Sequence, residues 1–517
     1  MNDGLLTKKT SITERILNSL EKSGNKLPQP TTLFAILALM VMIGSAVASF
    51  FQASVDIQQV DSATGQIKDI TITAKSLVNE DGIRFIFENA IANFTGFAPV
   101  GIVLVALFGV AAAEGTGLLK ALVKKMIYGI NQRYITAMII FLGVLSHVAS
   151  DAGYVVVIPL GAIIFNSLGK NPLAGIAAGF FGVSGGFSAN LLLGSIDPLL
   201  GTFSTAGANV LDPSYYVSPT ANYYFMAASA FLVVIVGTLV SEKIVEPRLG
   251  KYRGGIEEKL EPITKEEARG LKYALVTLLI SLGVLFLMIL PEGAVLRNQE
   301  TGDIITNSPF MNSIVIIVTL LFFLPGVFYG IGAKTVKNDR DLLNAMSTMV
   351  NTMGSYLILT FVAAQFVAFF KYSNLGTILA VNGADVLKTT GLKGIPLLVV
   401  FILLSSSINL FIGSTVTKWS IMAPVFIPMF MMLGFSPELT QLAYRIGDSA
   451  THIISPLLPF VGLVLAFADK YQKNIGIGTM MSIMFPYSII LLITWTVFLI
   501  IWLLLGVPIG PGVPVNF

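Results

Sequence analysis

The sequence predicts an all-α polytopic membrane protein with nine transmembrane helices and two opposed re-entrant hairpins, built from inverted repeats. Three observations support this prediction. First, 54% of the 517 residues are hydrophobic and only 12% are charged, which is far from the composition of a soluble domain. Second, many apolar runs reach the roughly 20 residues that a helix needs to cross a bilayer. Third, segment 145–193 recurs without a gap as segment 410–458.

The two recurring segments align at a constant offset of 265, and 11 of their 49 positions are identical. Because membrane sequences draw on few residue types, apolar matches alone carry little weight. The more specific matches are prolines and glycines, namely Pro159 with Pro424, Pro172 with Pro437, and Gly182 with Gly447. Internal duplication in an apolar chain is typical of secondary transporters, in which two repeats surround a site near the membrane midplane.

The apolar runs predict the individual elements in order. We expect transmembrane helices at 32–53, 95–116, 172–196, 222–243, 272–290, 311–330, 352–371, 437–467 and 480–507. Regions 134–168 and 396–433 each contain two apolar segments of about 15 residues around a polar break. Fifteen helical residues reach about 22 Å, short of a hydrocarbon core of about 30 Å. Re-entrant hairpins with polar tips therefore fit these two regions better than spanning helices.

The charges orient this layout. Most Lys and Arg residues fall in the N-terminal segment 1–31, the loop 244–271 and other loops on the same side, whereas the loop 198–221 has none. By the positive-inside rule, we expect a cytoplasmic N-terminus, an external tail at 508–517 and a location in the inner (plasma) membrane. The first half, 32–243, and the second half, 272–507, then insert their hairpins from opposite sides.

Other features narrow the function. The polar N-terminal 30 residues predict no cleaved signal peptide, and the alternation from Ile70 to Thr73 predicts a short strand pair in an external segment, 54–90. The chain has no cysteine and two histidines, which excludes disulfides and thiolate metal sites and argues against a histidine metal cluster. A membrane-embedded enzyme needs paired acids, a histidine cluster or a Ser/His dyad at depth, which the scattered acids and distant histidines do not provide.

Ionisable side chains inside a bilayer cost about 2.5–3.5 kcal/mol each on insertion scales, so each needs a reason. The candidates are Glu114, Asp151, Asp197, Lys418, Arg445, Asp448 and Asp469. Arg445 and Asp448 are three residues apart on one predicted helix, so they share a face and can form a structural ion pair. In a functional interpretation, compatible with that pair, Asp448 binds the coupling cation. Arg445 then faces an anionic substrate, because its planar fork matches a carboxylate.

Neutral oxygens accompany these charges. The small and polar residues at 447–452, which include Ser449, and the Ser455, Pro456 and Pro459 that follow them predict an unwound segment whose carbonyls coordinate Na⁺. Asn190, Asn409 and Ser414 lie in Ser/Asn-rich breaks and offer oxygens to a hard cation or to the polar edge of a substrate; interhelical hydrogen bonding is the alternative. The first-half counterpart of Asp448 is uncharged, so we place the main coupling group in the second half.

The remaining candidates each have two interpretations. Asp197, followed by a proline, serves either a helix terminus or the substrate, and Asp151 near His147 is either a proton relay or a turn former. Trp419 either stacks on an aromatic ligand or packs at an interface, while its neighbour Lys418 extends toward the membrane surface. Glu114 and Asp469 lie near predicted helix ends, where we expect them to be solvated.

Several gap-free blocks resemble the p-aminobenzoyl-glutamate transporters, the AbgT family, and the resemblance covers nearly the whole chain. The blocks are Gly24-Asn25-Lys26-Leu27-Pro28, Ser150-Asp151-Ala152-Gly153-Tyr154, the glycine-rich run 182–191, Lys418-Trp419 and Ala443-Tyr444-Arg445-Ile446-Gly447-Asp448-Ser449. The resemblance implies the ion-transporter superfamily, a homodimer, and nine helices with two opposed hairpins in each subunit. It also implies an ion-coupled carrier, by symport or antiport, of p-aminobenzoyl-glutamate or related folate fragments.

Some members similar to this chain export sulfonamide-type antimetabolites, so proton-driven export is the alternative function, and a channel is a more distant one. The family's functional positions fall here on Asn409, Trp419, Pro437, Arg445 and Asp448, with Asp197 as the first-half aspartate. The implied partners are a small anionic aromatic substrate and the lipid bilayer, with no cofactor and with Na⁺ or H⁺ as coupling ion. Import versus export and the choice of ion stay open.

Overall fold

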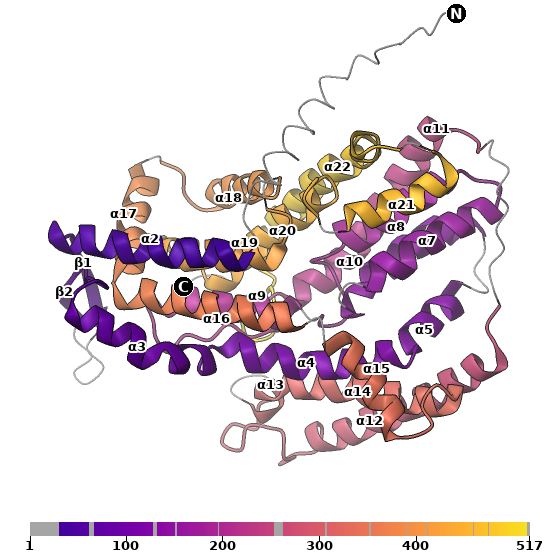
Figure 1. Cartoon of the computed structure of the whole chain (residues 1–517), viewed down its shortest axis with the longest axis horizontal. Coiled ribbons are helices and arrows are strands. Elements are labelled where there is room, and N and C mark those ends of the chain that lie inside the picture. The colour runs from indigo at the N-terminus through magenta and orange to yellow at the C-terminus, as the bar shows by residue number, and fades with distance from the viewer. Residues whose placement is uncertain are drawn as a thin grey trace, which may run out of the picture.

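The computed structural model describes residues 30–513 except 61–66, 128–131, 150–151, 195, 253–261, 305–307, 351–352, 390, 411, 459 and 474. It is mostly helical (Figure 1). The first-half helices are α2 Pro30–Phe50, α3 Glu80–Thr95, α4 Ala98–Gly115, α5 Leu118–Ile127, α6 Ile135–Leu145, α7 Ala152–Ser167, α8 Pro172–Phe180, α9 Ile196–Ala208, α10 Tyr223–Val240 and α11 Glu246–Leu249. Short 3₁₀ turns, Gln132–Tyr134 and Ser146–Ala149, flank α6, and single π-helical turns extend α8 (Phe181–Gly185) and α10 (Ser241–Val245).

The second-half helices are α12 Lys265–Ile289, α13 Pro309–Asn312, α14 Ile314–Ala333, α15 Asp339–Val350, α16 Met353–Tyr372, α17 Leu375–Thr389, α18 Ile395–Ile408, α19 Thr415–Met431, α20 Pro437–His452, α21 Val461–Tyr471 and α22 Ile477–Leu504. Among the described residues, five helices are long and apolar enough to cross a membrane, or six if the bent pair α16 and α17 counts as one span. The structure therefore supports several spans, and the full count of nine stays a prediction. Helices α3, α5, α15 and α17 were not predicted.

The predicted strand pair is confirmed as an antiparallel hairpin of β1 (Ser54–Val60) and β2 (Ile67–Thr73). Its register places Val55 opposite Ile72, and their side chains pack on Ile378 of α17. The hairpin therefore covers one end of α17 and is attached to the helical body rather than free of it.

Two predicted spans are broken helices. The span expected at 172–196 leaves helical geometry after Gly185 and resumes at Ile196, and the span expected at 437–467 is interrupted between His452 and Val461. The unwound segment expected from Gly447 through Pro459 is confirmed in its second part only. Residues 447–452 are helical, and the chain leaves helical geometry after His452, at 453–458. Pro456 has no N–H to continue the helix.

The internal repeat is visible in the element boundaries. Helices α8 and α20 begin 265 residues apart, as do α9 and α21. A glycine with left-handed backbone geometry lies three residues before α8 (Gly169, φ +69°) and three residues before α20 (Gly434, φ +84°). Asn171 and Ser436 then cap the two helices with their side-chain oxygens.

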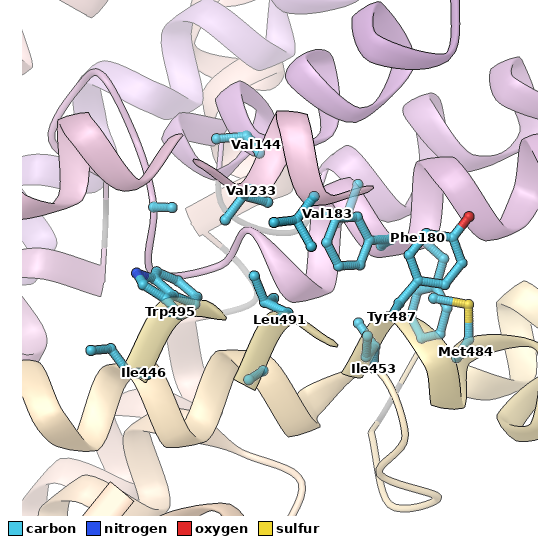
Figure 2. Close-up of a cluster of buried hydrophobic side chains, with 14 of the residues drawn as sticks. Val144, Phe180, Val183, Val233, Ile446, Ile453, Met484, Tyr487, Leu491 and Trp495 are labelled. Atoms are coloured by element: carbon cyan, nitrogen blue, oxygen red, sulfur yellow. The ribbon is translucent and has the colours of Figure 1, made fainter. Parts of the chain in front are cut away.

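One large core joins the two repeats. Figure 2 shows Val144, Phe180 and Val183 of the first repeat close to residues of α20 and α22 such as Leu491 and Trp495. The second part of each broken helix packs on the other repeat: α9 packs on α19 of the second repeat, and α21 packs on α7 of the first. The other helices form peripheral layers, α2 with α16, and α4 with α12 and α14 (Figure 1). This arrangement leaves α19 and α20 at the centre, in contact with both repeats.

Candidate functional site

The first centre of the site is a fully buried ion pair between Lys418 of α19 and Asp448 of α20. The Lys418 ammonium donates to Asp448 Oδ1 and to Asn409 Oδ1, and Thr415 Oγ1 donates to Asp448 Oδ2 at 2.6 Å. The carboxylate thus has a partner at each oxygen. The expectation that Lys418 extends to the membrane surface was wrong, because its side chain has no exposed area.

The second centre is the ion pair between Arg445 Nη2 and Asp197 Oδ1, which are 2.6 Å apart with both side chains 1% exposed. Asp197 also accepts from the Gly194 amide at 2.7 Å, so it closes the break before α9 as well as pairing across the repeats. The predicted pairing of Arg445 with Asp448 is not seen. Although the two share a helix, each has a nearer partner on another element. Together, the four charges of the two ion pairs sum to zero.

Trp419 follows Lys418 on α19 and contacts Tyr444, the residue before Arg445. Its indole ring stacks on Tyr444, with centroids 4.4 Å apart, and its Nε1 donates to Ser204 Oγ at 2.9 Å. Ser204 donates to Gln441 Oε1 at 2.6 Å, and Gln441 donates to Asn222 Oδ1 at 2.8 Å. The chain of hydrogen bonds connects α19, α9, α20 and the start of α10. It fixes the Trp419 ring and links the two repeats.

The predicted neutral ligands fall into two groups. Asn409, at the end of α18, donates from Nδ2 to the Asp448 carbonyl and to Thr451 Oγ1 (3.0 Å), which turns its Oδ1 toward Lys418. Asn409 therefore belongs to the first centre. Ser414, by contrast, caps α19 by accepting from the Thr417 amide at 3.3 Å, so its oxygen serves the helix terminus.

The two histidines and Phe187 form a third group, on the first-repeat side. The Phe187 ring meets His147 edge-to-face at 4.6 Å between centroids and His452 at 5.4 Å. Phe187 and His452 are 265 residues apart, so they are equivalent positions of the two repeats in mutual contact. His147 Nε2 bonds the Val183 carbonyl. The relay partner proposed for it, Asp151, lies outside the described residues.

Several buried polar atoms have no hydrogen-bond partner among the described residues. Six of them are Arg445 Nε, Ser449 Oγ, Asn190 Nδ2, Ser188 Oγ, His147 Nδ1 and His452 Nδ1; others lie on α6 and α22. Buried polar groups are nearly always satisfied, so a group of such atoms calls for water, an ion or a ligand. Three of the six lie on α20, which carries one member of each ion pair, and three lie in the break after α8 or the turn after α6. The arrangement therefore offers donors and acceptors to a polar ligand.

Three sequence candidates take structural positions. Pro437 is the first residue of α20, which the Ser436 side chain caps, a position that suits proline because the lost N–H has no helical partner there. Asp469 is paired with Lys473 in a solvent-exposed position, and Glu114 is half-buried. The described residues contain no group of three or more His, Cys, Asp or Glu that can hold a metal ion.

Sequence reasoning missed Thr415, Tyr444, Ser204 and Gln441. Their contribution depends on tertiary contacts, since Ser204 meets Trp419 and Gln441 from another repeat. A local signal existed only for Thr415 and Tyr444, which adjoin the charged residues of α19 and α20. The Tyr444 hydroxyl donates to the Thr415 carbonyl at 2.6 Å, which ties these two helices together.

Comparisons with known proteins agree with the resemblance in the sequence. Residues 15–517 match the model of the AbgT putative transporter family. The chain is 40% identical, over 494 residues, to the p-aminobenzoyl-glutamate transport protein of Escherichia coli (strain K12), covering 96% of each chain. Among solved structures, it is similar to the Alcanivorax borkumensis YdaH transporter (TM-score 0.86, 43% identity, 94% of this chain and 100% of that one). It is also similar to Neisseria gonorrhoeae MtrF, described within a class of antimetabolite efflux pumps (TM-score 0.90, 46% identity, 97% and 100%).

Proposed function

We propose a function from one premise: this chain belongs to the AbgT putative transporter family. The protein is a secondary transporter that couples movement of p-aminobenzoyl-glutamate, or a related folate fragment, to an ion gradient. It works by alternating access, with the α6–α7 and α18–α19 segments acting as re-entrant gates on opposite sides. The observation that carries the proposal is the pair of buried, charge-neutral ion pairs between the repeats, beside polar atoms that lack partners.

The substrate's chemistry matches the second centre. p-Aminobenzoyl-glutamate has an aromatic amine ring and two carboxylates. Arg445 keeps Nε without a partner in the described structure, so its guanidinium has a donor left for a carboxylate. The Trp419–Tyr444 stack is fully buried in this structure, so we propose that its rings are uncovered for the substrate ring during the transport cycle. Asp197 then holds the Arg445 guanidinium in place through Nη2 when no substrate is bound.

The coupling ion belongs to the first centre. Asp448 supplies the charge, and Asn409 Oδ1 and the free Ser449 hydroxyl supply neutral oxygens. This set of ligands favours Na⁺, which prefers oxygen donors, although a buried carboxylate also carries a proton. Asn190 of the first repeat belongs instead to the substrate, to which its unpartnered Nδ2 can donate. His147 with Asp151 stays our candidate for a proton relay.

Export of sulfonamide-type antimetabolites is the second candidate function, and the similarity to MtrF favours it. Sulfonamides share the aromatic amine of p-aminobenzoyl-glutamate but lack its glutamate carboxylates. Both ligands suit the Trp419–Tyr444 stack, whereas only the first needs Arg445. In the variant Arg445→Gln, we expect sulfonamide transport to be retained and p-aminobenzoyl-glutamate transport to be lost. That result would identify one site that serves both ligands.

We further propose the topology that this function requires. The N-terminus is cytoplasmic, nine helices cross the inner membrane, and the segment with the β-hairpin is external. The homodimer implied by the family is part of the same proposal. Labelling of single introduced cysteines tests the topology directly, because the chain has no native cysteine.

The first experiment is flux of radiolabelled p-aminobenzoyl-glutamate in proteoliposomes, under Na⁺ and H⁺ gradients imposed separately. We expect saturable flux under one of the two gradients, which names the ion. A linear, non-saturable flux would indicate a channel. Folded protein that shows no flux under either gradient would remove this substrate and direct the search to antimetabolite export.

Replacement of Asp448 by Asn tests the coupling assignment. The amide keeps the shape and can still accept from Lys418, so we expect the protein to fold and coupled flux to be lost. The readouts are flux under the driving gradient and size-exclusion elution. Wild-type coupled flux in this variant would overturn the role of Asp448.

Replacement of Trp419 by Ala tests aromatic recognition. Contacts between aromatic rings contribute about 0.5–1.5 kcal/mol beyond the energy of burying their surface area. We therefore expect a several-fold rise in the KM for p-aminobenzoyl-glutamate. The comparison ligand is a glutamate derivative without a ring. An equal loss for both ligands would refute the stacking role and leave Trp419 as a packing residue.

A further inference from the structure

Lys418 is the one charged residue of the site that the proposed function does not use. Its ammonium is fully buried and bonds two oxygens, Asp448 Oδ1 and Asn409 Oδ1. These are the same two oxygens that the proposed function gives to the coupling ion. We propose that the Lys418 ammonium is a tethered substitute for that ion, so that Lys418 and Na⁺ alternate at Asp448. The inference rests on the proposed ion coupling and names the residue that controls it.

The ligand chemistry permits this exchange. A lysine ammonium is a compact charge with three donors and no acceptor, and it therefore needs oxygens, as Na⁺ does. The Asn409 amide is turned with Oδ1 toward the cation because its Nδ2 is held by the Asp448 carbonyl and Thr451. Thr415 holds the other carboxylate oxygen at 2.6 Å. The oxygen pair is thus oriented by groups that do not depend on Lys418.

Charge balance at Asp448 favours the exchange. The two ion pairs, Lys418–Asp448 and Arg445–Asp197, are buried and neutral together. A cation added while the ammonium stays on Asp448 would put two positive charges on one carboxylate in a low-dielectric interior, which is strongly unfavourable. If the ammonium leaves Asp448 when Na⁺ arrives, the carboxylate keeps a single cation partner, and the displaced positive charge needs another partner nearby.

The ammonium also has a place to go. Its Nζ lies 5.9 Å from the centroid of the Tyr444 ring, within the range at which a cation is attracted to an aromatic face. The four-carbon stem of lysine is flexible. A rotation about that stem moves Nζ toward the ring while the α19 backbone stays fixed.

The first repeat shows that the fold does not need this ion pair. The equivalents of Lys418 and Asp448 are Gly153 and Val183. A Cβ built on Gly153 would lie 2.1 Å from Ser146 Oγ and 3.1 Å from the Val183 side chain, so the two positions adjoin in both repeats. In the first repeat neither position carries a charge.

Na⁺-dependent thermal unfolding of Lys418→Met, in detergent and without substrate, tests the proposal. Sodium chloride is titrated against choline chloride at constant ionic strength. We expect the variant to be half-maximally stabilised by at least tenfold less Na⁺ than the wild type, because the tethered competitor is gone. Methylammonium should stabilise the variant and raise the Na⁺ concentration it needs, since both occupy the same oxygens. The double variant Lys418→Met/Asp448→Asn should respond to neither.

The matched control is Lys473→Met, which removes a lysine from an exposed ion pair with Asp469 and should keep the wild-type Na⁺ response. A wild-type response in Lys418→Met would overturn the proposal, as would failure of that variant to fold in both high Na⁺ and methylammonium. Because no substrate is used, these results are independent of which molecule is transported. Loss of p-aminobenzoyl-glutamate flux with an intact Na⁺ shift would reject only the substrate.

Discussion

The two repeats share a backbone and differ in what they bury. In the first, Val144 and Val183 belong to the main apolar core (Figure 2), and Gly153 adjoins Ser146 and Val183. At the equivalent positions of the second, an asparagine, an aspartate and a lysine form the first ion-pair centre. The same exchange occurs at the second centre, where Phe180 stands at the position of the arginine.

The difference separates structure from function. Val183 shows that this backbone packs well without a charge, so the charges of the second repeat are not explained by folding. Buried ion pairs are often no more stabilising than apolar side chains of similar volume. The Lys418–Asp448 pair is present in the second repeat alone, which indicates a task that only that repeat performs. We infer that the first repeat supplies the frame and the second binds the ion.

Asp448→Val, which brings the first-repeat residue into the second, is the strongest test of this comparison. It leaves Lys418 buried without a counter-charge, and we expect a loss of about 3–5 kcal/mol in the free energy of unfolding. The measurement is reversible denaturation in detergent micelles. The double variant Lys418→Met/Asp448→Val should regain most of the loss, and a double variant as unstable as the single one would show that the apolar version does not fit this repeat.

The serines at equivalent positions give a smaller, sharper test. Ser184 Oγ bonds the Tyr154 hydroxyl at 2.7 Å, whereas Ser449 Oγ has no partner in the described structure, because Trp419 replaces the tyrosine and turns its Nε1 toward Ser204. We expect Ser184→Ala to cost about 1 kcal/mol. Ser449→Ala should cost about 0.5 kcal/mol or less and should weaken Na⁺ stabilisation instead. Equal destabilisation of the two variants, by thermal unfolding, would contradict the assignment of Ser449 to the ion.

The glycines before α8 and α20 provide the case in which the repeats should agree. Gly169 and Gly434 both have positive φ and open space around the Cβ position. Alanine at either should therefore cost only the backbone strain of the left-handed region, about 1 kcal/mol. We expect the two losses, measured by thermal unfolding, to match within error. Different losses would show that the two turns are not equivalent.

The sequence predicted the backbone better than the contacts. The repeat offset, the strand pair and most helix positions follow from periodicity and from residues such as Pro456, which act locally. The partner of Arg445 did not follow, because Asp197 is 248 residues away and reaches it across the repeats. A spacing of three residues favoured Asp448, and no local rule shows that Lys418 is nearer. Helix α17 was not predicted because its polar residues interrupt the apolar pattern, although it continues α16 after a bend.

The contact between Phe187 and His452 has a consequence for the direction of transport. Two equivalent positions can touch only near the axis that relates the two repeats. In the alternating-access cycle that we propose, exchanging the surroundings of the two repeats does not restore this contact, because one partner is Phe and the other His, and Phe187 also meets His147. The pair therefore favours one opening over the other at rest, while the gradient decides which way the substrate moves.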